Sequence, residues 1–240
     1  IYRPHLPWYV PQKYFDLFDE EDIVLPKALE DDLEDIPSAG VKIAKPQGDH
    51  AKVIQHDQWK KAVHGYLASI AFADEQVGRV LDALRNGLRA KDTIVVLWTD
   101  HGWHLGEKQH WRKFTLWEEA ARTPLMIHVP EKLSKNFPKG TTAGARIDIP
   151  VGLIDVYPTL VDLCDLGENK ALAGQSLIPL LKNPKVKWDR PALTTHGRNA
   201  HALRTPRWRY VRYGDGSEEL YDHDADPNEW TNLAGKPKHT

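Results

Sequence analysis

Apolar residues along the chain fall into runs with two kinds of spacing, and the longest run has the spacing of an α-helix. Between residues 59 and 88 the apolar side chains recur at steps of three and four residues, which places them on one face of a helix of about seven turns. They are Trp59, Val63, Leu67, Ile70, Val77, Leu81, Leu84 and Leu88. We therefore expect a long amphipathic helix that packs beside a sheet.

Two shorter runs predict strands. Residues 94–99, Ile-Val-Val-Leu-Trp-Thr, are largely apolar and do not alternate, a pattern typical of a strand covered on both faces. Residues 124–130 place Leu-Met-Ile-His-Val between two prolines and predict a second strand. With a further helix expected at 151–166, these elements indicate the α/β class.

The pattern changes past residue 185 to short strands rich in arginine and aromatic residues. Residues 208–213 and 219–221 flank Asp215-Gly216, which is a hairpin-turn signal. We therefore divide the chain into a large α/β portion, residues 1–184, and a small antiparallel subdomain, residues 185–240. Residues 16–58 carry acidic runs, scattered prolines and little periodicity, and they predict a long surface excursion.

Composition narrows the class of protein. A chain of 240 residues with 41% hydrophobic content can bury a sizeable core. Its formal charge of −2 argues against nucleic acid or an anionic membrane as a partner. The single cysteine, Cys164, excludes an internal disulfide, and its place on an apolar helix face predicts a small buried side chain.

Residues able to do chemistry gather directly after the strand at 94–99. Asp100 and His101 end that strand, and ligands of open α/β sheets bind outside the carboxyl ends of strands. A carboxylate beside an imidazole suits a metal ion or an anionic substrate, although the same residues before Gly102 are also typical of a simple turn. The loop that follows interleaves charged and aromatic residues in a way that ordinary surface loops rarely do: Trp103, Glu107, Lys108, His110, Trp111, Arg112, Lys113, Phe114 and Trp117.

These segments resemble the sulfatase family, most closely its iduronate-2-sulfatase-like branch, within the alkaline-phosphatase-like superfamily. The similarity runs through nearly the whole chain and is specific in order and spacing. It is carried by residues 3–7 (Arg-Pro-His-Leu-Pro), 98–107 (Trp-Thr-Asp-His-Gly-Trp-His-Leu-Gly-Glu), 110–114 (His-Trp-Arg-Lys-Phe), 122–127 (Arg-Thr-Pro-Leu-Met-Ile), 155–160, 219–222 and 226–229.

The resemblance implies roles for six residues. Asp100 and His101 match ligands of a single divalent cation, usually Ca²⁺. Lys113 matches the lysine that contacts the sulfate and its bridging oxygen, where a positive charge stabilises the transition state. His5 matches the histidine that protonates the leaving alcohol. Trp103 and His104 are placed to touch the substrate.

The resemblance also implies that other parts of the site lie elsewhere. Sulfatases use a formylglycine nucleophile made from a Cys/Ser-x-Pro-x-Arg sequence and an Asp-Asp pair upstream at the cation. These 240 residues contain no such nucleophile sequence, and the resemblance assigns none of them to that Asp-Asp pair. We therefore expect the carboxyl-terminal part of a sandwich with a large mixed sheet between helices, plus the small antiparallel subdomain. Its partners would be the amino-terminal portion of the same enzyme and a sulfated small molecule or glycan. By itself the chain would be inactive, and the family suggests a periplasmic or secreted location.

Two alternative functions remain open at this point. One is a metal-dependent phosphoesterase of the same superfamily, which would use two transition ions and a Ser or Thr nucleophile. The other is a non-catalytic carbohydrate-binding relative, which the nine tryptophans of the chain would suit.

Overall fold

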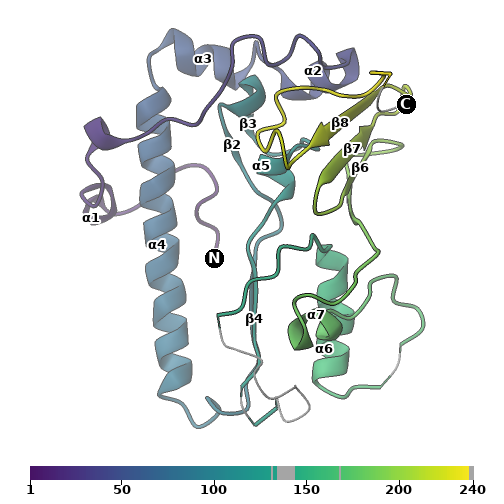
Figure 1. The fold of residues 1–240 in the computed structure, drawn as a ribbon. Helices are drawn as coiled ribbons and strands as arrows, with labels where there is room; N and C mark the ends of the chain where they lie inside the picture. Colours follow the sequence, from purple (N-terminus) through teal and green to yellow (C-terminus); the bar gives the residue numbers. More distant parts are fainter. Residues whose placement is uncertain (131, 134–143, 168, 238–240) are drawn as a thin grey trace.

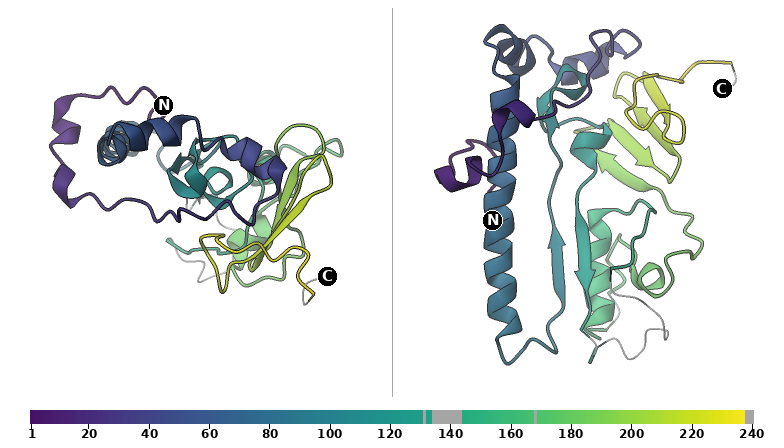
Figure 2. Two further views of the ribbon diagram at one scale, coloured as in Figure 1. Left: turned by 90° about the horizontal axis from the view of Figure 1, so that it is seen from above. Right: turned by 60° about the vertical axis from the view of Figure 1, so that its left-hand side comes forward.

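The computed structural model describes residues 1–130, 132–133, 144–167 and 169–237. Helix α4, Trp59–Arg85, runs nearly the length of the molecule, beside strands β1, Val95–Trp98, and β4, Leu125–His128 (Figures 1 and 2). These elements confirm the predicted helix and the two predicted strands. Within the described residues, no helix is both long enough and apolar enough to cross a bilayer.

Strands β1 and β4 are antiparallel neighbours, with Leu97 opposite Met126 and Trp98 opposite Leu125. Among the described residues they form a two-stranded sheet. The prediction that β1 is covered on both faces is wrong for this chain, because its residues are only half-buried and Trp98 is 49% exposed. Among the described residues β1 has one neighbouring strand, β4, so part of its apolar surface stays exposed to solvent.

The amino-terminal segment is more structured than its pattern predicts. It contains α1 (Gln12–Phe15), the 3₁₀ helix η1 (Glu20–Asp22), α2 (Ser38–Ala44) and α3 (Asp49–Gln55). Ile36 and Ala44 are buried in a cluster with Trp117 and Tyr221. The expected surface excursion is therefore only partly correct. The helices were missed because each has seven residues or fewer, too short for a clear apolar period.

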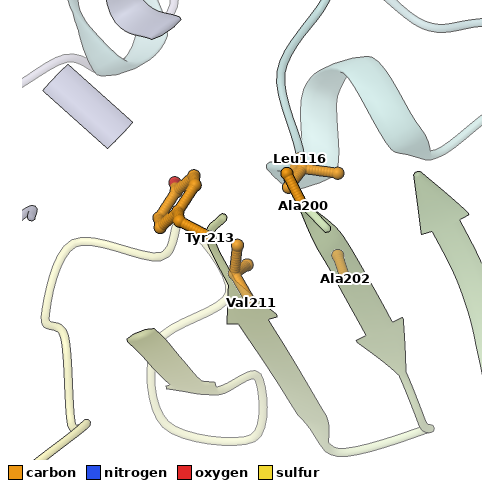
Figure 3. Packing of buried hydrophobic residues seen from close by; sticks show 5 residues of the cluster. All are labelled: Leu116, Ala200, Ala202, Val211 and Tyr213. Carbon is orange, nitrogen blue, oxygen red and sulfur yellow. The ribbon is translucent and has the colours of Figure 1, made fainter. Parts of the chain in front are cut away.

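The carboxyl-terminal residues form a four-stranded antiparallel sheet in the order β5-β6-β7-β8. Its strands are β5 (Ala192–Thr195), β6 (His201–Arg204), β7 (Trp208–Arg212) and β8 (Glu218–Asp222), which confirms the predicted hairpin. Figure 3 shows one face of this sheet packing on Leu116, through Ala200, Ala202, Val211 and Tyr213. The domain boundary at residue 185 stays a prediction.

Along the chain, between β4 and β5, lie the 3₁₀ helix η4 (Leu153–Asp155), α6 (Val156–Leu163) and α7 (Ile178–Lys182). The helix predicted at 151–166 is thus present but shorter. Cys164, at the end of α6, is exposed, so its interpretation as a small buried side chain is wrong. Helix α6 ends at Leu163, one residue before the cysteine.

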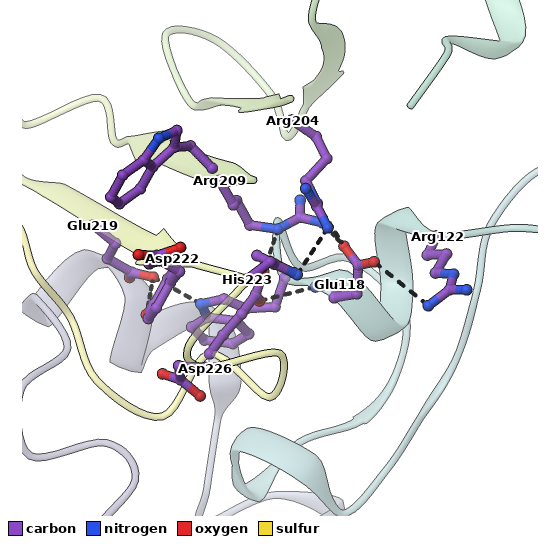
Figure 4. Close-up of polar contacts among 12 residues, drawn as sticks. Glu118, Arg122, Arg204, Arg209, Glu219, Asp222, His223 and Asp226 are labelled. Atoms are coloured by element: carbon purple, nitrogen blue, oxygen red, sulfur yellow. Dashed lines mark hydrogen bonds and ion pairs between the residues drawn. The ribbon is translucent and has the colours of Figure 1, made fainter. Parts of the chain in front are cut away.

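A buried network of charges joins the short helix α5 (Glu118–Ala121) to the carboxyl-terminal sheet (Figure 4). The Arg209 guanidinium donates to the carboxylates of Glu118 and Glu229, and Nε2 of His223 lies 2.8 Å from Glu229 Oε1. Burial alone would raise the pKa of the Glu229 carboxyl, but the charge of Arg209 and the contact with His223 lower it to about 2. Glu118, His223 and Glu229 lie close enough to hold a metal ion, yet Arg209 already pairs with both carboxylates and Arg204 pairs with that of Glu118. We interpret this group as structural.

Candidate active site

Side chains from three distant segments meet at the ammonium group of Lys113. Its Nζ lies 3.3 Å from Nε2 of His5, which is 108 positions earlier in the chain, and 3.0 Å from Nε2 of His101. Asp100 joins the group, with its Oδ2 3.7 Å from Nε2 of His101. The structure therefore brings together four of the six residues proposed from the sequence.

Backbone carbonyl groups fix the orientation of both imidazole rings. Nδ1 of His5 lies 2.9 Å from the oxygen of Leu6, and Nδ1 of His101 lies 2.7 Å from the oxygen of Gly102. The hydroxyl of Tyr2 also contacts Nδ1 of His5, at 2.8 Å. A carbonyl oxygen can only accept, so each Nδ1 donates to it and each Nε2 can turn a lone pair toward the ammonium. Both Nε2 atoms are therefore acceptors for the Lys113 ammonium, and the one on His101 is also suited to bind a metal ion.

The loop after β1 is held against α5 by two backbone bonds. The amides of Gly102 and Trp103 donate to the carbonyl oxygens of Ala120 and Glu119, both at 2.8 Å. A β-carbon at position 102 would lie 1.9 Å from the Glu119 oxygen, so only glycine fits this close approach. This contact fixes the position of Asp100 and His101 at the end of the strand.

A second loop carries Lys113. It contains β2 (His104–Leu105), the 3₁₀ helix η2 (Glu107–Gln109) and β3 (Trp111–Arg112). The ring of His110 contacts two carbonyl oxygens, that of Ala44 at 2.7 Å from Nδ1 and that of Lys113 at 2.9 Å from Nε2. His110 therefore anchors the backbone of Lys113 to the end of α2. No pattern in the sequence indicated this role.

Trp103 lies beneath the site rather than across its opening. It is 9% exposed, and its ring centroid lies 5.3 Å from that of His5 and 6.1 Å from that of His101. On its other side it stacks on Tyr66 of α4, at 6.3 Å. Within the described residues its Nε1 has no hydrogen-bond partner. These contacts fit a residue that positions the two histidines.

His104 lies apart from this group. It is fully buried, with Nε2 2.8 Å from Thr115 Oγ1 and Nδ1 3.2 Å from the oxygen of Glu107. Burial, together with the charge of His110, lowers the pKa of the His104 imidazole to about 3. A neutral ring with both nitrogens occupied has no atom left for a substrate, so the proposed site does not include it.

The site opens into a groove of about 3340 Å³. Asp100, His101 and Lys113 line it together with Phe114, and His196 lines it from the carboxyl-terminal sheet. His201 is outside the groove, with its Nδ1 3.0 Å from Thr195 Oγ1. Of these two histidines, only His196 lines the same groove as the site.

Asp100 and His101 can serve as ligands of a divalent cation. The Asp100 side chain is 78% exposed and supplies hard oxygen donors. His101 adds Nε2, whose lone pair faces the Lys113 ammonium at 3.0 Å in this structure and would be given to the cation instead when one is bound. Calcium takes six to eight ligands, so these two residues would form one side of its coordination shell.

The comparisons with known proteins agree on one family. A family model described as sulfatase matches residues 1–166, and a second, for the carboxyl-terminal part of N-sulphoglucosamine sulphohydrolase, matches residues 106–240. A sulfatase of Formosa agariphila is 44% identical over 98% of the chain, and a choline-sulfatase of Rhizobium meliloti is 30% identical over 98%. The chain spans 45% of the length of each of these two relatives.

Solved structures share the fold. A structure in complex with its substrate D-glucosamine-2-N,6-O-disulfate superimposes with a TM-score of 0.80 at 22% identity, covering 99% of this chain and 60% of the other. A phosphonate monoester hydrolase of Silicibacter pomeroyi also has a TM-score of 0.80, at 25% identity, covering 99% of this chain and 51% of the other.

Proposed function

Because this chain belongs to the sulfatase family, we propose that it supplies the cation-binding and leaving-group-binding side of an active site that hydrolyses sulfate esters. The observation that carries the proposal is the convergence of His5 and His101 on the Lys113 ammonium, at 3.3 and 3.0 Å. The nucleophile and the remaining cation ligands would come from sequence outside these 240 residues.

Lys113 and His5 would have different roles at the ester bond: Lys113 would stabilise negative charge, and His5 would protonate the leaving alcohol. A lysine ammonium has three N–H donors, enough to contact a sulfate oxygen and the bridging oxygen while the negative charge on the latter grows. His5 presents Nε2 on the same side, where it accepts from Lys113. Once this nitrogen has taken up a proton, from that ammonium or from water, it can pass the proton to the departing alkoxide. The hydrogen bond from Nδ1 of His5 to the backbone oxygen of Leu6 fixes the ring so that Nε2 points into the site.

Asp100 and His101 would hold the divalent cation, which we propose to be Ca²⁺. When bound, such a cation supplies positive charge that polarises a sulfate oxygen. Trp103 packs against the His101 ring and so keeps the ligand in place.

The expected formylglycine does not fit any residue of this chain. Its single cysteine, Cys164, lies in Val-Asp-Leu-Cys-Asp-Leu-Gly and lacks the proline and arginine of the modification sequence. It is also absent from the residues that line the groove. We therefore assign no step of the reaction to Cys164.

We propose an organic sulfate ester, with a sugar as its alcohol, as the substrate class. The names of the two relatives support sulfate esters, and the substrate complex of the neighbour solved with D-glucosamine-2-N,6-O-disulfate supports a sugar as the alcohol. A phosphonate monoester hydrolase of similar fold keeps phosphorus esters as a second candidate class.

The test uses the complete protein, meaning the product of the whole reading frame that encodes this chain. Turnover of 4-nitrophenyl sulfate, 4-nitrophenyl phosphate and a phenylphosphonate monoester is compared under identical conditions. The proposal expects the sulfate to be hydrolysed fastest and His5→Ala to lower its turnover. The matched control Lys187→Ala, on an 85% exposed side chain, should leave turnover unchanged.

Two results would contradict the proposal. Faster hydrolysis of a phosphate or phosphonate ester would favour the phosphoesterase. Binding of sulfated sugars without turnover of any ester would favour the non-catalytic relative.

A further inference from the structure

Phe114 combines two features that work against stability. Its side chain is 69% exposed, although it follows directly after Lys113 and precedes the buried residues Thr115 and Leu116. Its backbone has a φ of +70°, in the left-handed region that bulky side chains rarely adopt. An exposed ring gains little from burial, and a left-handed phenylalanine costs on the order of 1 kcal/mol or more. Nothing in the packing of the described residues accounts for a phenylalanine at this position.

The left-handed turn places the Phe114 ring beside the ammonium of Lys113. Arg112 is also left-handed, with a φ of +76°, so the backbone is sharply bent on both sides of the lysine. The ring centroid of Phe114 lies 5.4 Å from Nζ of Lys113, and both residues line the groove. A group attached to an anion held by Lys113 would therefore lie within reach of an exposed aromatic face.

We propose that Phe114 is a specificity-determining residue, on which the carbon skeleton of the leaving alcohol packs, and that this skeleton is a neutral pyranose ring. The proposal rests on the function proposed above, and it adds which part of the substrate is recognised and by which residue. Backbone strain of this kind persists at binding sites, where the conformation serves recognition rather than stability.

The charge of the neighbouring lysine favours a neutral sugar over a cationic alcohol. An aromatic face attracts cations, but this one already has the Lys113 ammonium beside it. A quaternary ammonium in the same place would be repelled by that charge, at a separation where screening by solvent is incomplete. The C–H face of a pyranose ring is neutral and flat, and it gains from contact with an aromatic face without this repulsion.

The experiment compares two substrates on the complete protein. One is glucose 6-sulfate, whose alcohol is a neutral pyranose, and the other is ethyl sulfate, which has the ester but no ring. Phe114→Gly removes the ring and suits the left-handed backbone, so it avoids the risk of an unfolded variant. Phe114→Tyr keeps the ring. Tyr157→Ala removes a 60% exposed aromatic residue that does not line the groove and is the matched control.

We expect Phe114→Gly to raise the KM for glucose 6-sulfate about tenfold, as the loss of one aromatic contact implies, with a much smaller change in kcat. The rise in KM for ethyl sulfate should be no more than a fifth as large. Phe114→Tyr should restore the KM for the sugar sulfate, and Tyr157→Ala should alter neither substrate. The Tm of Phe114→Gly should equal or exceed that of the wild type, because strain has been removed.

Several outcomes would overturn the inference. An equal rise in KM for both substrates, or no rise for the sugar sulfate, would show that the ring does not recognise the sugar. Hydrolysis of ethyl sulfate but of no sugar sulfate would exclude a sugar as the alcohol. A clear fall in the Tm of Phe114→Gly would show that the ring packs within the protein. Failure of the proposed function looks different, because the wild type would then hydrolyse neither sulfate ester.

Discussion

Lys108 and Lys113 lie five positions apart on the same loop, and their ammonium groups have opposite surroundings. Nζ of Lys108 is buried, 2.7 Å from Oδ1 of Asp32, and lies over the ring of Tyr221. Within the part of the chain that the structure describes, Lys113 has no carboxylate within ion-pairing distance, and its Nζ faces two imidazole nitrogens. The first lysine fastens the loop, and the second keeps its charge available for an anion.

We expect the charge of Lys113 to act mainly in the transition state. Lys113→Ala in the complete protein should lower kcat for a sulfate ester about a hundredfold, as the loss of one positioned donor worth about 3 kcal/mol implies. Lys113→Arg should recover little, because a planar guanidinium does not reproduce a compact ammonium at one bridging oxygen. Turnover is measured at saturating substrate and constant calcium. If Lys113→Ala kept most of the wild-type kcat, the loop would not lie over the sulfate.

Lys108 should instead matter for stability. Lys108→Met leaves the Asp32 carboxylate buried without its partner, and breaking such a pair typically costs about 3–5 kcal/mol of unfolding free energy. Burial already raises the pKa of the Asp32 carboxyl, with the charge of Lys108 opposing that shift. The check is urea unfolding at neutral pH. Lys13→Ala, which breaks an exposed pair with Glu75, is the control and should change the midpoint far less.

The sequence predicts those parts of the fold that leave a regular pattern. Helix α4 and strands β1 and β4 follow from apolar spacing, and the position of Asp100 and His101 follows from the end of a strand. The meeting of His5 with Lys113 needed the family resemblance, because no local pattern links residues 108 positions apart.

Other features leave no pattern in the sequence. Asp32 belongs to an acidic run that is typical of a solvated surface, and only the distant Lys108 makes its burial tolerable. The left-handed backbone of Phe114 is equally hidden, since phenylalanine is not a residue that predicts it. Burial of His104 depends on Thr115 and Glu107, which the fold brings around the ring.

The proposed cation ligands give a prediction about metal dependence. A chelator should abolish sulfate-ester turnover by the complete protein, and added calcium should restore it. Asp100→Asn keeps an oxygen donor but removes its charge, so it should raise the calcium concentration needed for half-maximal activity by about tenfold or more. Asp162→Asn, on α6, provides the control. If a chelator did not change the turnover, the proposal that this site binds a cation would be wrong.

Glu119 gives a prediction about pH. Burial, and then the charge of Glu229, raise the pKa of the Glu119 carboxyl to about 8, from an ordinary value of 4.5. The folded state therefore binds more protons than the unfolded state between these two values. The contribution of this group to stability is full below pH 4.5 and is lost as the pH rises through 8, by about 1.4 kcal/mol for each pH unit between the two pKa values.

Glutamine resembles the protonated acid, so Glu119→Gln should remove that loss. We expect the variant to match the wild type in unfolding free energy near pH 4.5 and to be more stable than the wild type at pH 8. His104 acts in the opposite direction, because its lowered pKa costs stability as the pH falls below 6.5. Nδ1 of His104 lies 4.0 Å from Oε2 of Glu119, so the variant also changes the surroundings of His104. A further comparison at pH 7.5, where His104 is largely neutral in both the folded and the unfolded state, separates the two effects. Unfolding by urea at pH 5 and pH 8 provides the measurement, with Glu34→Gln, an exposed carboxyl, as the control. A stability difference that did not grow with pH would show that Glu119 is ionised in the folded protein, and that the contact between α5 and the loop of Trp103 accommodates a buried charge.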